Sequence, residues 1–430
     1  MIKLWFLPLS QSRKGTGCVS KIKGAGAFFI CLLFVLAWYL ASFYSGWTLW
    51  YQNDISVRWE ETSGVSPAYL SKELRWQHQE GGFVPEFVMW RTEQSQQLLG
   101  DQNDRSVTGE ILEYYGDISL LYPVKFLSGY WASDERGCVI DKSVADTLWG
   151  SSEVVGRSIL WNGKTWYVRG VIDGDESTAF FPAQEDDTTE FSGILFRLPK
   201  SQIGIMQAEQ ILNQCHLPAG KITDLGLFSW ITEAMSSIPV FLMWGSLTLK
   251  LIYQIWKVRS TQLILLVTIL FVLMQFLFIC WAAGFPWTIP DRFLPTRWSD
   301  TSFWRELGRS VIYPIKEIFI KLPSVWEQWF WKQFFYSGVF SIIAVVLLLF
   351  IFNLQCVKRS GFVLWKSIVY WGMVLILTWI FGERIFQYPP ASILTMPPVW
   401  MTSQWMMDRY HKWLGLIKEQ EKGNDKNEEE

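Results

Sequence analysis

Five apolar stretches of about 20 residues each constrain the fold of this chain more than any other feature of its sequence. None holds more than one charged residue, and they run over 26–47, 238–256, 263–285, 334–352 and 362–381. A helix needs about 20 apolar residues to cross a hydrocarbon core of about 30 Å. The sequence therefore predicts five membrane-spanning helices, although Pro239 and Lys250 interrupt the second stretch.

The charged residues divide the chain into parts of opposite sign. No acidic residue precedes the first apolar stretch, whereas five basic residues do: Lys3, Arg13, Lys14, Lys21 and Lys23. Basic residues beside a span stay in the cytoplasm, so we expect a cytoplasmic N-terminus and an uncleaved first span rather than a signal peptide. Residues 49–225 hold 26 acidic and 14 basic residues, and we expect this segment on the other side of the membrane.

The acidic segment 49–225 is long enough for one domain or for two small lobes. Its patterns alternate: helices are expected over 66–79, 141–149 and 201–215, and strands over 82–91, 137–140, 155–160, 166–171 and 193–197. Asn162-Gly163 falls between two of these strands and is typical of a two-residue hairpin turn. We therefore predict a mixed α/β domain inserted after the first membrane-spanning helix.

Glycines punctuate this domain in a regular order. Leu127-Ser128-Gly129 precedes the strand at 137–140, the next helix ends at Leu148-Trp149-Gly150, and the hairpin reads Val155-Gly156-Arg157, Asn162-Gly163 and Trp166 to Ile172 with Gly170 near its end. We expect Gly156 and Gly170 to lie where the strands approach other backbone. The order and spacing resemble the extracytoplasmic core domain of the MacB-like and FtsX-like ABC transporter permeases.

This resemblance implies a permease-like subunit that works with a separate ABC ATPase and a second permease subunit, beside the lipid bilayer. The membrane half is atypical. Permeases of the family usually carry a helix between two later spans that docks into the ATPase, but the corresponding loop here is only 256–262. The later loop at 353–361 is equally short.

The N-terminal segment is the largest remaining surface expected in the cytoplasm. Its apolar Trp5, Phe6 and Leu7 could pack against a partner while Arg13 and Lys14 meet acidic groups or lipid phosphates. An anchor on the membrane surface that has no protein partner is the alternative.

Residues 304–333 alternate apolar and charged residues at helical spacing. This pattern predicts an amphipathic helix in the outer membrane interface, with a lid over a lateral exit path as the alternative. Pro314 and Pro323 are expected to break the helix. The tryptophans of this region and of the C-terminal part are typical of an aromatic belt at the membrane surface; they are Trp326, Trp329, Trp331, Trp400 and Trp405.

No catalytic constellation, cofactor motif or nucleic-acid signature is evident in the sequence. The phosphate-binding pattern GxxxxGK[ST] is missing, so ATP hydrolysis is expected in another chain. The three histidines lack the spacing of a metal site. Cys138 and Cys215 are the two cysteines of the predicted external domain, and whether they pair stays open because connectivity cannot be read from sequence.

These patterns together predict a polytopic α-helical membrane protein of the bacterial plasma membrane. Its parts are a cytoplasmic segment (1–25), a first span (26–48), an extracytoplasmic α/β domain (49–225), four further spans (226–382) and a C-terminal tail (383–430), whose charged end from 418 onward is expected to be disordered. The function expected is that of a permease-like subunit of an ABC exporter or of an ABC machine that does mechanical work. The alternative is a membrane-anchored binding or sensing protein without ATPase coupling.

Overall fold

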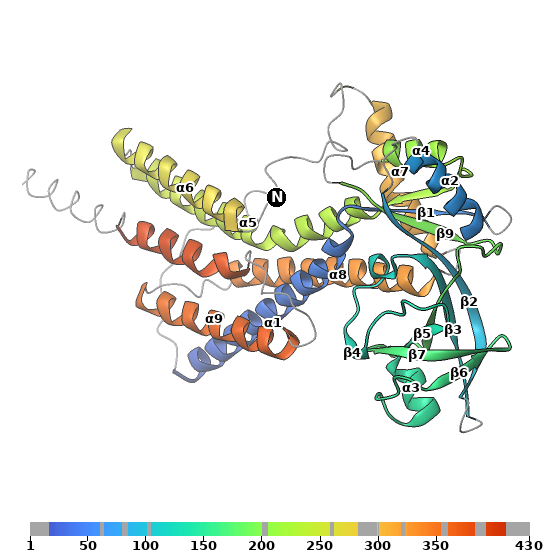
Figure 1. The fold of residues 1–430 in the computed structure, drawn as a ribbon. Helices are drawn as coiled ribbons and strands as arrows, with labels where there is room; N and C mark the ends of the chain where they lie inside the picture. The colour runs from blue at the N-terminus through green and yellow to red at the C-terminus, as the bar shows by residue number, and fades with distance from the viewer. Residues whose placement is uncertain are drawn as a thin grey trace, which may run out of the picture.

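The computed structural model describes residues 17–60, 64–79, 85–100, 105–199, 205–258, 262–282, 299, 301–319, 323–353, 360–382 and 393–409. It contains a bundle of long helices with an α/β domain at one end (Figure 1). The domain is inserted after the first long helix, so the predicted fold class is confirmed.

One sheet organises the α/β domain. Its strands follow the order β10-β1-β9-β2-β3-β8-β5-β7-β4, and β6 pairs with β2 and β7. Most pairs are antiparallel, whereas β3–β8 and β5–β7 are parallel. The strands are β1 (Asp54–Arg58), β2 (Glu86–Gly100), β3 (Ser106–Gly116), β4 (Phe126–Gly129), β5 (Gly137–Asp141), β6 (Ser158–Trp161), β7 (Lys164–Ile172), β8 (Thr178–Pro182), β9 (Gly193–Arg197) and β10 (Lys221–Asp224).

The two faces of the sheet are covered by different parts of the chain. Successive side chains of a strand point to opposite faces, and in β2 Met89 packs with α2 (Pro67–Gln79) and α4 (Ile205–Gln214). Its neighbours Val88 and Trp90 belong instead to a cluster that includes residues of the long helices. Helix α3 (Lys142–Trp149) covers the far end of the sheet. The long helices therefore supply part of the core of this domain.

The predicted hairpin at Asn162-Gly163 is confirmed. Strands β6 and β7 pair with Trp161 opposite Lys164, which leaves two residues in the turn. Asn162 has φ 49° and Gly163 has φ 72°. A two-residue turn with positive φ at both positions matches the right-handed twist of the strands it joins.

Replacing Gly163 by valine should lower the free energy of unfolding by about 1 kcal/mol or more, because a β-branched residue is disfavoured at positive φ. A Cβ atom at Gly163 would meet nothing within 4 Å, so the cost is conformational. The thermal unfolding midpoint of the purified full-length protein measures the effect. Thr165→Val, an exposed neighbour in β7, is the matched control. An equal midpoint for the two variants would contradict the prediction.

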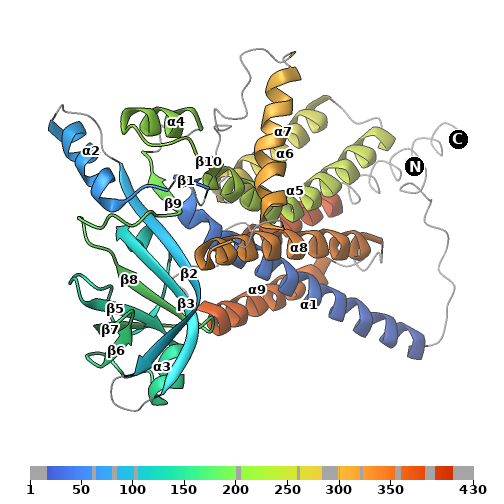
Figure 2. The same cartoon turned by 90° about the vertical axis from the view of Figure 1, so that its right-hand side faces the viewer.

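The bundle consists of α1 (Gly17–Thr48), α5 (Leu225–Val258), α6 (Gln262–Ala282), α8 (Val325–Asn353) and α9 (Ser360–Gly382). Within the described residues, four helices are long and apolar enough to cross a membrane, at Phe29–Tyr51, Leu225–Tyr253, Leu265–Ala282 and Val325–Ile351. The apolar part of α9, Ser367–Phe381, is shorter. Figure 2 shows these helices extending from the sheet toward the same side.

Two helices differ from the sequence-based expectation. Helix α5 begins directly after β10 at Leu225, and Pro239 lies inside it. Helix α7 (Thr301–Ile318) continues through Pro314, so the expected break at this proline is wrong. A proline inside a helix costs a hydrogen bond, and burial of Pro314 against the domain offsets that loss.

The structure describes the two cysteines of the domain and part of the C-terminal segment. Cys138 and Cys215 are both free, and they belong to separate hydrophobic clusters, so no disulfide joins them. Residues 393–409 form a helix that packs within the bundle. The charged end of the tail, 418–430, lies outside the described residues.

Candidate functional site

Three helices of the bundle end inside the core of the α/β domain, and we call this region the junction. It comprises Tyr51 after α1, Leu225 and Phe228 of α5, and Trp326, Phe330 and Trp331 of α8, all packed in one cluster with the sheet. Asp224 of β10 accepts a hydrogen bond from the Leu227 N–H at 3.0 Å and so caps α5 without an intervening linker.

The first turns of α8 form the centre of the junction. Trp326 is 1% exposed and packs edge-to-face against Trp90, with ring centroids 4.9 Å apart. Phe330, one turn later, meets Tyr51 at 5.2 Å. The Tyr51 hydroxyl donates to the Leu121 carbonyl at 2.5 Å. Aromatic pairs of this kind stabilise beyond the area they bury, so the ends of α1 and α8 are joined to the sheet and to each other.

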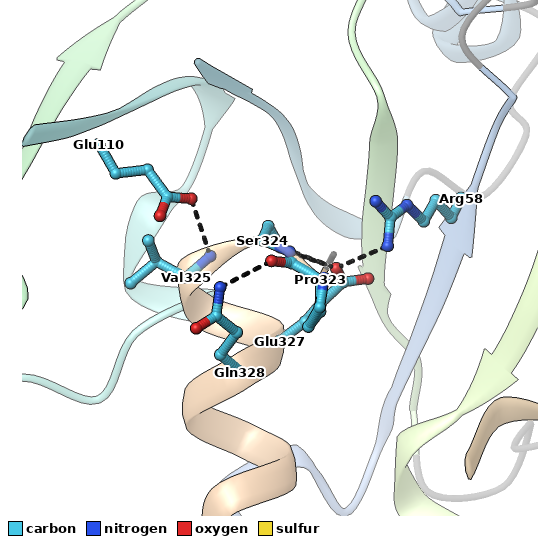
Figure 3. A network of polar contacts seen from close by, with 7 residues as sticks. All are labelled: Arg58, Glu110, Pro323, Ser324, Val325, Glu327 and Gln328. Atoms are coloured by element: carbon cyan, nitrogen blue, oxygen red, sulfur yellow. Dashed lines mark hydrogen bonds and ion pairs between the residues drawn. The ribbon is translucent and has the colours of Figure 1, made fainter. Parts of the chain in front are cut away.

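Polar contacts set where α8 begins (Figure 3). The Ser324 N–H and hydroxyl both donate to the Glu327 carboxylate, each at 2.9 Å, and the first of these bonds is one half of a capping box. Glu327 also pairs with Arg58 of β1 at 3.1 Å. The Val325 N–H donates to Glu110 of β3 at 3.3 Å. The N-terminus of α8 is therefore bound to two strands of the sheet.

Two carboxyl groups near the junction have pKa values raised by burial. Burial raises the pKa of Glu110 to about 7, although the Val325 N–H opposes the shift. Burial likewise raises the pKa of Asp54 to about 6, against the lowering effect of Arg197. Arg197 binds both oxygens of Asp54 at 2.8 Å, which ties β9 to the start of β1.

Helix α7 joins the junction from the side. Its Val311, Ile315 and Ile318 pack against the junction cluster. Lys221 of β10 donates to Glu317 of α7 at 2.5 Å. The edge strand β10 is therefore bound to α7, and it also continues directly into α5.

Hydroxyl groups link α1, α5 and α8 next to the junction. The hydroxyl oxygens of Thr48 in α1 and Thr232 in α5 are 2.6 Å apart and share a hydrogen bond. Ser337 of α8 donates to the Ala41 carbonyl of α1 at 3.0 Å. These contacts require close approach of the three helices, so α1, α5 and α8 enter the domain as one packed unit.

A second candidate site is a groove of about 1060 Å³ in the α/β domain. Helix α2 lines one wall with Lys72, Arg75 and Trp76, and the end of β3 contributes Tyr114 and Tyr115. Four acidic residues also line the groove: Asp134, Glu135, Glu185 and Asp186. Arg75 pairs with Glu185 across it.

The glycines singled out in the sequence lie away from the junction and serve the backbone. Gly150 ends α3 at φ 72°, and Gly129 lies against the Arg169 backbone. A Cβ atom added at Gly170 would meet Phe126 and the Tyr130 carbonyl, whereas one added at Gly156 would meet nothing within 4 Å. The Gly156 N–H itself donates to the Val168 carbonyl of β7 at 2.8 Å. Trp5, Phe6, Leu7, Arg13 and Lys14 lie outside the described residues.

The junction was not predicted from the sequence. Trp326 and Trp331 were expected in a belt at the membrane surface, but both are buried in the cluster that includes the sheet. Ser324-Val325-Trp326-Glu327 is an S-x-x-E pattern directly after Pro323. This pattern signals a helix start and would have placed the beginning of α8 at the domain rather than at 334.

The α/β domain is similar to three solved structures. The periplasmic region of MacB from Actinobacillus actinomycetemcomitans is 11% identical, with 40% of this chain and 89% of that chain covered and a TM-score of 0.33. The extracellular domain of the noncanonic ABC-type transporter YknZ from Gram-positive bacteria is 13% identical, with 39% of this chain and 96% of that chain covered and a TM-score of 0.30. A domain of a putative permease protein from Porphyromonas gingivalis is 13% identical, with 38% of this chain and 83% of that chain covered and a TM-score of 0.29.

A scan against models of protein families finds no match, and a comparison with curated proteins finds none either.

Proposed function

We propose that this chain is a permease-like membrane subunit that transmits movement of its membrane helices to an extracytoplasmic α/β domain. ATP hydrolysis is supplied by a separate ABC ATPase, since the sequence lacks a GxxxxGK[ST] loop. The junction is the observation that carries this proposal.

A rigid connection is what mechanical transmission requires. A domain on a flexible linker would not follow small shifts of its anchor, whereas packed cores and interfaces switch as units. Here α5 follows β10 without a linker, and Trp326 and Phe330 of α8 are buried with Trp90 and Tyr51. A tilt or shift of α8 therefore has to move β1 and β3, to which its N-terminus is hydrogen-bonded.

The charge pattern supports the orientation in this proposal. Basic residues precede the apolar part of α1 and the α/β domain is acidic, a distribution that favours a cytoplasmic N-terminus and an external domain. Because the loops at 256–262 and 353–361 are short, the N-terminal segment 1–25 is the proposed contact with the ATPase and with a second permease subunit.

The first experiment tests the partner. Purification in mild detergent should recover an ABC ATPase and a second permease with this chain, and deletion of residues 2–12 should lose them while the protein stays in the membrane. Deletion of residues 419–429 removes the same number of residues from the other end and is the control. Recovery of the chain alone, or retention of the ATPase after the first deletion, would count against ATPase coupling.

Hydrogen exchange in the purified complex tests the transmission. Adding ATP in place of ADP should change the protection of backbone amides in 110–121 and 323–331, because both segments lie in the junction. Peptides from α4, on the other face of the sheet, are the internal reference. Unchanged protection at the junction in an ATPase-active complex would contradict the proposal.

The groove supports a second candidate function, in which the domain is a membrane-anchored recognition module without ATPase coupling. Its lining combines aromatic side chains with more acidic than basic residues, a composition that suits a cationic amphipathic ligand. A receptor needs one anchor, however, and the burial of three helix ends in the domain favours transmission.

A further inference from the structure

We propose that α7 lies in the lipid headgroup layer on the side of the α/β domain, where Arg305, Arg309 and Lys316 bind the phosphates of anionic phospholipids. The inference is independent of ATPase coupling, because it concerns a surface of the chain itself.

The depth follows from α8. Its apolar stretch of about 20 residues, the length that crosses the hydrocarbon core, runs from position 334 to 352. The rings of Phe335 and Phe319 are 6.3 Å apart. Phe319 directly follows α7 and is 78% exposed. The end of α7 therefore lies at the edge of the hydrocarbon core.

The N-terminal end of α7 lies at about the same depth in the membrane as its C-terminal end, because of the direction of the helix. In Figures 1 and 2, α7 runs across the direction of α8, so it extends along the membrane surface rather than through it. Trp304, near the start of α7, is exposed. Tryptophan is enriched at the membrane–water boundary because its ring is amphipathic.

The side chains of α7 form three stripes along the helix. The first is wholly or partly buried against the junction and includes Val311, Pro314 and Ile318. The second is apolar and exposed, with Trp304, Ile312 and Phe319 separated by eight and seven residues. The third is basic, with Arg305, Arg309 and Lys316 separated by four and seven residues, which places them on one side of the helix.

An apolar stripe beside a basic stripe is the pattern of a helix that lies in an anionic lipid surface. All three basic side chains are exposed, and no ion pair of theirs is found in the described part of the chain. Lys221 differs, because it is paired with Glu317, which lies outside the basic stripe of α7. The basic stripe is therefore available for phosphate groups, while the apolar stripe contacts the acyl chains.

Lipid binding by α7 is expected to stabilise the edge of the sheet. Helix α7 is bound to β10 through Lys221 and Glu317 and to the junction through its buried stripe. Anionic lipid that fixes α7 at the surface should therefore stabilise the whole α/β domain.

The test measures the thermal unfolding midpoint of the full-length protein in neutral detergent as phosphatidylglycerol is added. Phosphatidylglycerol should raise the midpoint of the wild type, whereas phosphatidylcholine and inorganic phosphate should not. The combined R305Q/R309Q/K316Q variant should need about a hundredfold more phosphatidylglycerol for half of the effect, at about 1 kcal/mol for each basic residue near a surface.

The control is R105Q/R136Q/K164Q, which removes two arginines and one lysine from exposed positions of the α/β domain. It should respond to phosphatidylglycerol as the wild type does. Ile312→Ser on the exposed apolar stripe should weaken the response while Arg305, Arg309 and Lys316 remain. An unchanged lipid response in the α7 triple variant, equal stabilisation by phosphatidylcholine, or the same loss in the control would overturn the proposal.

Discussion

Replacing Trp326 by alanine is expected to lower the free energy of unfolding of the α/β domain by about 3–5 kcal/mol, the range for removing a large aromatic side chain from a core. The side chain is 1% exposed and lies between Trp90 and Tyr51. Its indole N–H has no hydrogen-bond partner among the described residues, so the loss comes from apolar contacts and from the cavity left behind.

Chemical unfolding of the full-length protein in detergent, followed by the fluorescence of its remaining tryptophans, measures this loss. Trp379→Ala is the matched control, because Trp379 of α9 is 74% exposed and its removal leaves no cavity. The junction variant should also show faster hydrogen exchange in β3 and at the start of α8. A Trp326→Ala protein as stable as the control would mean that α8 does not contribute to the core of the domain.

Gly129→Ala should lower the free energy of unfolding by about 2–5 kcal/mol, from two separate causes. Gly129 has φ 74°, which costs about 1–2 kcal/mol for a residue with a Cβ atom. A Cβ atom there would also overlap the Arg169 carbonyl and the Gly170 Cα. Overpacking of this kind adds about 1–3 kcal/mol, because β4 has to move away from β7.

Gly156→Ala separates the two causes. Gly156 also has a positive φ, of 89°, but an added Cβ atom would meet nothing within 4 Å. Its substitution should therefore cost only the conformational part. The difference between the two unfolding free energies, measured under the same conditions, isolates the overlap in β4. If Gly156→Ala were as destabilising as Gly129→Ala, the close approach of β4 and β7 would not explain the glycine.

Short-range sequence signals were enough for the membrane-spanning character of the chain, for the inserted α/β domain and for the turn at Asn162-Gly163. An apolar stretch of about 20 residues is itself the property that suits a helix to a bilayer. A turn with positive φ at two successive positions similarly depends on the residues that occupy it. Helix α2 and the cap of α3 by Asp141 were predictable for the same reason, since caps act within a few residues.

The remaining strands and the junction depended on contacts between residues far apart in the chain. Strands β3 and β8 were not predicted, and they pair in parallel although more than 60 residues separate Glu110 from Thr178. Likewise, the sequence around Trp326 suits both a membrane surface and a protein core, because an amphipathic aromatic segment satisfies either. The face of the sheet that α2 and α4 do not cover decided between them. On this face Trp90, together with Tyr51, forms an apolar surface that the first turns of α8 bury. Burying this surface removes more apolar area from water than a position of Trp326 at the membrane boundary would.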